Sequence, residues 1–430
     1  MIIIHAADIH LGSTLGGLDQ HEGLPVDIIR AAPLTAFERI ADLCAERGAD
    51  LLLLAGDLFD RDASLATIRD ATRVLKRITS GGTRVVTLRG NHDAVSRMQR
   101  RLPQIDGLHE LSSTEPETLV LDELGVAVHG RGFDTQHVTE NIVRAYPARI
   151  DGALNLGLLH TSLEGNAAHA VYAPCELADL VALGYDYWAL GHIHQHAVLR
   201  DAPWVVYAGS PQGRHIGEVG DHGVYVLRVE EGSLVGAPEH VELGSVRWHR
   251  VEVAASAEDD DAEVMVARAR DAILETIEPY GTGVRHIVRL ELTGRCAAHV
   301  ELHADPDRWR DELRLAADGI ASATVHVERV RMKTSPPLPD PGTLRERHDV
   351  IGKLARHLAA EELARLESGE LLTRNAPAAF TQLDAKLRPL ADAAAALRGT
   401  DVATDELAAA TDDLLARLLV ASASAAEEGR

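Results

Sequence analysis

Residues 51–60, LLLLAGDLFD, carry the strongest indication of the fold. Four consecutive leucines without a charge are typical of a strand that is buried on both faces, as in the middle of an α/β sheet. Gly56 permits a tight turn, which leaves the carboxylate of Asp57 at the carboxyl end of that strand. Ligands of open α/β sheets bind at this end, so Asp57 is a candidate functional residue. An Asp after a Gly is also common in ordinary turns, and one such pair decides little.

The same succession of an apolar strand and a polar side chain recurs at four other places. Strands expected at 2–4, 84–88, 154–159 and 187–190 each lead into His, Asp or Asn, usually beside a glycine. The residues concerned are Asp8, His10, Asn91, His92, Asp93, His160, His192 and His194. The Asp-x-His and His-x-His pairs among them have the spacing that puts both side chains on one side of an extended backbone.

These candidate ligands are nitrogen and oxygen atoms without a thiolate, a combination that favours manganese, iron or zinc over a structural cysteine site. Two neighbouring sites about 3.5–4 Å apart, bridged by one carboxylate, are the usual arrangement for hydrolysing phosphate esters. A single motif of this kind could equally be a turn or a polar residue at the rim of a sheet, and one motif alone does not establish a metal site. Five of them in order, all at strand ends, make a metal site the better interpretation.

The five motifs resemble those of the calcineurin-like metallophosphoesterases. They are Asp8-x-His10, Gly56-Asp57, Gly90-Asn91-His92-Asp93, His160 and Gly191-His192-x-His194. Five longer stretches are similar in sequence to bacterial DNA repair exonucleases of the SbcD/YhaO type, and to the YhaO-like branch in particular. They are GDLFD, GNHD, LLHTSLEG, YWALGHIH and AGSPQGRH. The resemblance is strong over the first half of the chain and loose over the remainder.

The resemblance implies an α/β fold, the four-layer metallophosphoesterase sandwich of two sheets flanked by helices. It also implies two divalent metal ions, for which Mn²⁺ is the expected metal. One ion is assigned to Asp8, His10, Asp57 and His194. The other is assigned to Asp57, Asn91, His160 and His192, so that Asp57 lies between the two ions.

The same resemblance implies that His92 is catalytic, meeting the phosphate or protonating the leaving oxygen. Asp93 is expected to orient the imidazole of His92 as a neighbouring carboxylate. Some relatives have a histidine where this chain has Asp60, so a second catalytic histidine is not expected here.

Three residues are expected to bind substrate. Arg97 follows GNHD closely and could contact a nucleic-acid backbone, with a solvated helix face as an equal alternative. Ser210, after Gly209, could offer a backbone amide to a phosphate, and Arg214 could pair with one. A turn held by Pro211 is the alternative for this second stretch.

Length and composition further restrict the number of domains and the cellular compartment that we expect. A chain of 430 residues is too long for one ordinary core and predicts two or three domains. No apolar run has the length of a membrane span, and the first strand begins too early to leave room for a cleavable signal. Three widely spaced cysteines are typical of a reduced compartment. We therefore expect a cytoplasmic protein without a membrane partner.

The formal net charge of −23 is unfavourable for unaided binding of DNA, because phosphate contacts normally come from Lys and Arg. Bound divalent ions would add positive charge where the scissile phosphate lies. The acidity of the remaining chain still indicates that a partner supplies much of the grip on DNA.

The chain is expected to divide into four parts. Residues 1–245 form the metallophosphoesterase (nuclease) domain, in which 32–47 is a helix with Pro33 in its first turn. Residues 246–334 form a small α+β domain of the series strand–helix–strand–helix–strand, which the resemblance makes a capping domain that selects DNA. Residues 335–342 are a Pro-rich linker. Residues 343–430 are C-terminal helices with a disordered tail.

The resemblance implies that the C-terminal helices dock onto an SMC-like coiled-coil ATPase of the SbcC/YhaN kind, with a simple packed helix pair as the alternative. The expected function is therefore a dinuclear-metal-dependent DNA phosphodiesterase, an exo- or endonuclease of DNA repair or recombination. The alternatives are a phosphodiesterase for cyclic or small nucleotides and a subunit that mainly regulates an ATPase. Related subunits commonly pair, so a homodimer is a further expectation.

Overall fold

The computed structural model describes residues 1–16, 18, 23–95, 103–163, 172–256, 259, 261–280, 283–320, 323–337, 346 and 348. The chain forms two compact units. One unit comprises Met1–Val251, Ala269–Leu290 and Leu313–Arg331, and the other comprises Glu252–Arg268, Glu291–Glu312 and the chain from Met332. The domain boundaries predicted after 245 and 334 stay a prediction, and the C-terminal helices predicted for 343–430 lie outside the described residues apart from Glu346 and His348.

The first sheet of the first unit is built around the leucine strand. Its order is β12-β11-β1-β2-β3-β4, with β13 also paired to β11, and β1 to β4 run parallel. The strands are β1 (Ile2–Ala6), β2 (Leu51–Leu54), β3 (Arg84–Thr87), β4 (Leu108–Glu110), β11 (Gly223–Glu230), β12 (Ser233–Leu234) and β13 (Glu239–Glu242). All four leucines of β2 are buried, as their uninterrupted apolar run predicts.

The second sheet has the order β5-β6-β7-β8-β10-β9, in which β6, β7, β8 and β10 run parallel. Its strands are β5 (Glu117–Leu121), β6 (Val126–Gly130), β7 (Leu154–His160), β8 (Tyr187–Gly191), β9 (Ala197–Asp201) and β10 (Trp204–Tyr207). Every residue of β6, β7 and β8 is buried, so apolar layers cover both faces of this part of the sheet.

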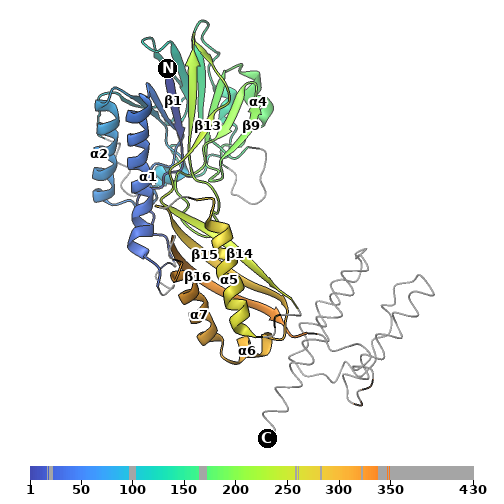
Figure 1. Ribbon diagram of the computed structural model, residues 1–430. Coiled ribbons are helices and arrows are strands. Elements are labelled where there is room, and N and C mark those ends of the chain that lie inside the picture. The colour runs from blue at the N-terminus through green and yellow to red at the C-terminus, as the bar shows by residue number, and fades with distance from the viewer. Residues whose placement is uncertain are drawn as a thin grey trace, which may run out of the picture. The chain divides into compact units, whose positions relative to one another are not determined.

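Helices cover the outer faces of both sheets, and the two inner faces share one core (Figure 1). Helices α1 (Val26–Arg47) and α2 (Leu65–Ser80) lie side by side and pack on the first sheet. The 3-10 turn η2 (Ile142–Ala145) and helix α4 (Leu177–Ala182) belong to the core on the outer face of the second sheet. The layers are helix, sheet, sheet and helix, so the predicted α/β sandwich is confirmed.

The start of α1 differs from the prediction. The helix begins at Val26, so that Pro33 lies inside it and not in its first turn. A proline there removes one backbone hydrogen bond of the helix. Burial favours the longer helix, because Ile29 and Ala32 pack with Trp248 in a separate apolar cluster of the same unit.

A third sheet has the order β14-β15-β16, from β14 (Val246–Ala255), β15 (Arg285–Arg295) and β16 (Thr324–Ser335). Helix α5 (Ala262–Ile277) follows β14, and α6 (His299–Ala304) and α7 (Pro306–Asp318) follow β15. The predicted strand–helix series is therefore present, with one short helix added. Among the described residues, no helix combines the length and the apolarity needed to cross a membrane.

Candidate metal centre

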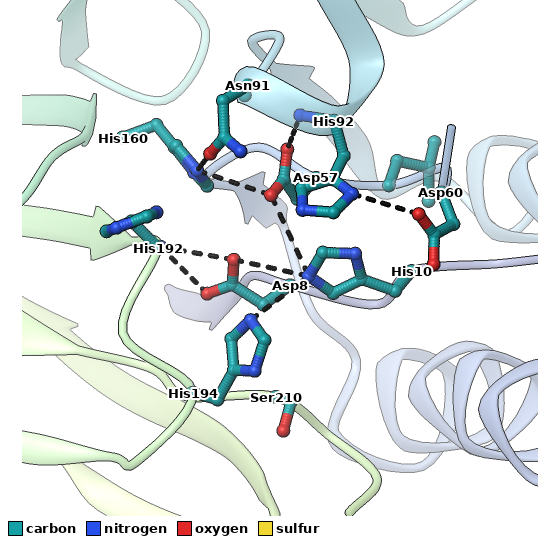
Figure 2. Close-up of polar contacts among 12 residues, drawn as sticks. Asp8, His10, Asp57, Asp60, Asn91, His92, His160, His192, His194 and Ser210 are labelled. Atoms are coloured by element: carbon teal, nitrogen blue, oxygen red, sulfur yellow. Dashed lines mark hydrogen bonds and ion pairs between the residues drawn. The ribbon is translucent and has the colours of Figure 1, made fainter. Parts of the chain in front are cut away.

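The polar residues after the parallel strands converge at one place, as the strand-end argument predicts (Figure 2). They come from both sheets, because β1, β2 and β3 end there in one sheet and β7 and β8 end there in the other. All seven predicted metal ligands lie in this cluster, namely Asp8, His10, Asp57, Asn91, His160, His192 and His194. Neither sheet alone supplies enough ligands, so the packing of the two sheets makes the site.

The backbone of this cluster is held in an uncommon conformation. Asp8, His10, Asp57 and His192 have φ angles of 52°, 50°, 51° and 98°, in the region that side-chain-bearing residues seldom adopt. Such conformations cost free energy and gather at functional sites, where the surrounding structure imposes them. Four such conformations among the seven candidate ligands therefore point to a functional site in this cluster.

The glycines of two motifs are required by close packing around Asp57. A Cβ atom on Gly56 would lie 2.6 Å from Nδ1 of His160, and Gly56 also has a φ of 90°. A Cβ atom on Gly90 would lie 2.2 Å from Oδ1 of Asp57. Any side chain at either position would displace a candidate ligand.

His160 shows most clearly that a cation fits here. Its Nδ1 lies 2.9 Å from the carbonyl oxygen of Ala55 and must donate to it, which leaves a lone pair on Nε2. That Nε2 lies 3.0 Å from Oδ1 of Asn91 and 3.4 Å from Oδ2 of Asp57. Three acceptor atoms that face one another in a buried site need a proton or a metal ion between them.

A second group of acceptors surrounds His10. Its Nε2 lies 3.1 Å from Nε2 of His194, 3.7 Å from Oδ2 of Asp57 and 4.0 Å from Oδ1 of Asp8. The Nδ1 of His10 is buried without a hydrogen-bond partner among the described residues. Both carboxylates and both imidazoles therefore direct ligand atoms into one small space.

The electrostatics of the centre favour a positive charge at its middle. Burial disfavours the ionised form of Asp57, but the charge and hydrogen bond of His160 outweigh it, and the pKa of Asp57 falls below its usual range. Burial likewise opposes charge on His160, yet the Asp57 carboxylate raises its pKa to about 9. The protonated imidazole thus supplies the charge that a metal ion would supply.

Three groups of described side chains bring possible ligand atoms within 4.8 Å of one another. They are Asp8 with His10 and His194, Asp8 with Asp57 and His160, and His10 with Asp60 and His92. The first two groups share Asp8 and contain no thiolate. They fit a pair of neighbouring divalent cations bound through oxygen and nitrogen.

His92 lies beside this cluster, but its carboxylate partner is not the predicted one. Its Nδ1 lies 2.9 Å from Oδ1 of Asp60, and its backbone N–H donates to Oδ1 of Asp57 at 2.9 Å. Burial lowers the pKa of His92, but the hydrogen bond to Asp60 and the charge of Asp57 outweigh it and raise that pKa.

Asp93 has a different function in the structure from the one predicted. Its carboxylate accepts the backbone N–H groups of Leu58, Phe59 and Gly90, at 3.3, 2.8 and 3.1 Å. Burial and the Asp57 charge raise its pKa to about 7. The prediction that Asp93 orients His92 is therefore wrong. Asp60 takes that position because the turn after β2 brings it to the His92 ring.

The three residues predicted to bind substrate differ in where the structure places them. Ser210 is 1% exposed, its backbone N–H donates to the carbonyl oxygen of His194, and its hydroxyl contacts Nδ1 of His222. Its polar groups are thus used within the protein, and the prediction that Ser210 binds substrate is wrong. Arg214 lies at the centre, with Nη2 3.1 Å from Nδ1 of His194. Arg97 lies outside the described residues.

Glu218 is a site residue that the sequence analysis missed. Its Oε1 lies 2.7 Å from Nδ1 of His194 and 3.0 Å from Nη2 of Arg214. Burial opposes its ionisation, but the hydrogen bond from His194 and the charge of Arg214 hold its pKa below the usual range. No motif marks it, because it lies in the loop before β11 and not at a strand end.

Comparison with known proteins agrees with this geometry. A family model described as calcineurin-like phosphoesterase matches residues 1–196, and one described as the middle domain of metallophosphoesterase YhaO matches residues 248–335. The "Uncharacterized metallophosphoesterase YhaO" of Bacillus subtilis is 31% identical over 307 residues, which cover 68% of this chain and 72% of the relative. The chain belongs to the calcineurin-like metallophosphoesterase family. The family predicted from the five motifs is thus confirmed.

Two more distant relatives carry names that describe a process or an activity. The "DNA double-strand break repair protein Mre11" of Methanopyrus kandleri is 25% identical over 307 residues, which cover 63% of each chain. A subunit of the nuclease SbcCD from Rhodobacter capsulatus is 27% identical over 297 residues, which cover 56% of this chain and 69% of the relative.

Proposed function

We propose that this metallophosphoesterase is a dinuclear-metal-dependent nuclease that hydrolyses DNA phosphodiester bonds in repair or recombination. The observation that carries the chemistry is the convergence of three buried acceptors at His160, Asn91 and Asp57, which a divalent cation would satisfy. The names of the Mre11 and SbcCD relatives support DNA as the substrate.

In this proposal Asp8, His10, Asp57 and His194 would hold one ion, and Asp57, Asn91, His160 and His192 would hold the other. We propose Mn²⁺ as the metal, which the family resemblance implies and which a set of imidazole nitrogens with carboxylate and amide oxygens can bind. When bound, two such ions supply positive charge to the phosphate and make a nucleophile available from water near neutral pH.

His92 and Asp60 handle the leaving group in this proposal. Asp60 accepts from Nδ1 of His92, which leaves Nε2 as the nitrogen that can donate a proton to the departing oxygen. The raised pKa of His92 keeps that proton available near neutral pH. Arg214 is proposed to pair with a non-bridging phosphate oxygen, and Arg97 stays a prediction for the nucleic-acid backbone.

We also propose a cytoplasmic setting and an SMC-like coiled-coil ATPase as partner. The formal net charge of −23 leaves the chain poorly suited to hold duplex DNA alone, and an ATPase that binds DNA would supply the contacts. The name of the SbcCD relative describes that protein as one subunit of an assembly.

The test is cleavage of end-labelled single- and double-stranded DNA with Mn²⁺, Mg²⁺ or a chelator, for the parent chain and for His92→Ala. We expect Mn²⁺-dependent cutting that falls by about 10²–10⁴-fold in His92→Ala, because general-acid assistance is lost, while the content of bound metal stays the same. The sizes of the labelled fragments also report whether digestion starts at an end and at which one.

A matched control is His109→Ala. His109 is also partly exposed and pairs with a carboxylate, since its Nε2 lies 2.6 Å from Oε1 of Glu117, but it lies on β4 and not in the metal cluster. This control should cut at the parental rate. Equal rates for parent and His92→Ala would refute the catalytic assignment. Turnover of a cyclic nucleotide without any cutting of DNA would point to the alternative substrate class.

A further inference from the structure

Glu218 is a buried carboxylate on which two positively polarised side chains converge. The residue is 8% exposed. Its Oε1 accepts from Nδ1 of His194 at 2.7 Å and from Nη2 of Arg214 at 3.0 Å. Its Oε2 accepts from the backbone N–H of Arg214 at 2.8 Å. One carboxylate thus contacts both a candidate metal ligand and the candidate phosphate-binding residue.

The contact with Glu218 decides which nitrogen of His194 carries the proton. A carboxylate accepts hydrogen bonds and does not donate them, so Nδ1 of His194 is the protonated nitrogen. Its Nε2 then carries a lone pair, and this is the atom that faces Nε2 of His10 at 3.1 Å. Only this tautomer can offer a ligand atom to a cation held with Asp8 and His10.

Arg214 would enforce the opposite tautomer if Glu218 were missing. Its Nη2 lies 3.1 Å from Nδ1 of His194. A guanidinium can only donate, so without the carboxylate it would donate to Nδ1 and move the imidazole proton to Nε2. A protonated Nε2 cannot bind a metal ion. The positive charge of Arg214 would also stay uncompensated beside the centre.

We propose that Glu218 is a positioning residue that keeps His194 in its metal-binding tautomer and prevents Arg214 from donating to it. This inference rests on the proposed function, because it concerns the same metal centre. Glu218 acts through His194 and Arg214 and has no contact of its own with the reacting atoms. The same carboxylate holds the Arg214 guanidinium next to the His194 side chain. A substrate phosphate at the metal centre would then lie close to Arg214 as well.

The loop that carries Glu218 is itself fixed in place. The backbone N–H of Glu218 donates to the carbonyl oxygen of His215 at 2.8 Å, and its own carbonyl oxygen accepts from Nε2 of His222 at 3.1 Å. A Cβ atom on Gly213 would lie 2.7 Å from that carbonyl oxygen, so the chain passes too closely there for another residue. The carboxylate is therefore held in position before any ion binds.

The experiment is a calorimetric titration of the metal-free full-length chain with Mn²⁺ alone. It compares the parent with Glu218→Ala and with the double variant Arg214→Met/Glu218→Ala. We expect two ions for the parent and a loss of about 10–100-fold in affinity for one of them in Glu218→Ala. The double variant should regain most of this loss, because the competing donor is gone.

Two further variants separate this effect from a general loss of structure. Glu328→Gln alters another buried carboxylate that pairs with an arginine, since its two oxygens lie 2.7 and 2.9 Å from Arg289, but this pair joins β15 to β16 in the third sheet. Its Mn²⁺ affinity should equal that of the parent. Glu218→Gln keeps the side-chain shape and can accept from one donor, so it should lie between the parent and Glu218→Ala.

The outcomes distinguish this inference from the proposed function. A parent chain that binds no Mn²⁺ would overturn the proposed function itself. A parent that binds two ions, with parental affinity in Glu218→Ala, would overturn only the inference. A double variant no better than Glu218→Ala would show that Arg214 is not the competing donor. Nitrogen-15 shifts of the His194 ring add a direct measurement, since the two tautomers differ there, and protonated Nε2 in the metal-free parent would contradict the inference.

Discussion

The first unit contains two buried clusters of histidines, which differ in whether carboxylates surround the imidazole rings. In the metal centre, His10 and His160 lie among the carboxylates of Asp8 and Asp57. In the third sheet, Nε2 of His249 lies 3.0 Å from Nδ1 of His286, so the two rings bond directly to each other. Both clusters are deeply buried, with His160 and His286 each 0% exposed.

The neighbours give His160 and the histidine pair of the third sheet opposite electrostatic behaviour, whereas burial and the charge of Arg214 lower the pKa of His10. Carboxylate charge raises the pKa of His160 to about 9 despite its burial. Burial, together with the positive charge of Arg247, lowers the pKa of His249 and of His286 to about 4. The first cluster thus attracts a cation, whereas the second is a neutral pair joined by a hydrogen bond. Among the described residues, the second belongs to no group of three possible ligands. Among the described residues of this chain, the buried histidines that face carboxylates form the candidate metal centre, and the pair that faces each other does not.

The largest effect should come from breaking the centre of the first cluster. Asp57→Asn removes the charge that His160, His10 and both ions would share, so we expect hydrolysis of bis-para-nitrophenyl phosphate at saturating Mn²⁺ to fall about a thousandfold or more. The corresponding change in the second cluster, His249→Asn, should leave the rate within about threefold of the parent. A variant Asp57→Asn that kept a tenth of the parental rate would show that the two clusters do not differ as described.

The second cluster should make the free energy of unfolding depend on pH in the acid range. Each of its rings has a pKa near 6.5 when unfolded and about 4 when folded, so between these values only the unfolded chain takes up protons. The pair therefore adds no pH dependence above pH 6.5 and destabilises the fold progressively as the pH falls from about 6.5 to about 4.

Urea unfolding at pH 7 and at pH 4.5 measures this contribution. The double variant His249→Leu/His286→Leu should lose less stability between the two pH values than the parent, by an amount on the order of 2 kcal/mol for each ring. All other titrating groups are common to the two chains, so the difference isolates the pair. Equal losses in parent and variant would mean that the rings titrate normally in the folded chain.

The smallest effect concerns the carboxylate at the edge of the metal centre. Asp60→Asn should lower kcat about tenfold, because the His92 ring loses the negative charge that orients it and favours its protonated form. Mn²⁺ affinity should stay within about twofold of the parent. Asp93→Asn is the variant for comparison. It should lower the unfolding temperature, because it weakens the hydrogen bonds that Asp93 accepts from the backbone of the turn after β2. A parental kcat in Asp60→Asn would remove Asp60 from the leaving-group step.

The sequence was informative where a short local pattern has one physical cause. An unbroken leucine run followed by Gly56-Asp57 predicts a buried strand with a carboxylate at its end, and both features are present. The other parallel strands follow the same pattern, so the polar residues at their ends could be located from the sequence, and the family resemblance implied which seven of them are ligands. The resemblance of the five motifs added the family, which the comparisons confirm.

The sequence misled where the partner of a side chain is set by a turn or by a distant loop. Asp93 follows His92 directly and yet binds the backbone near Leu58, whereas Asp60 from another loop contacts the imidazole. Ser210 lies in a motif-like turn, but the packing of His222 against it uses its hydroxyl. Adjacency in sequence did not predict these contacts, because side chains on consecutive residues point in different directions.

The strands, the family and the candidate ligands could all be read from the chain, because each depends on residues that are close in sequence. Three features required the folded structure: which acceptors face one another, which carboxylate orients His92, and the control that Glu218 exerts on the tautomer of His194. The physical reason is that hydrogen bonds and charge interactions act over a few ångströms in space. Glu218 comes within 2.7 Å of His194 although 24 positions separate them in the chain.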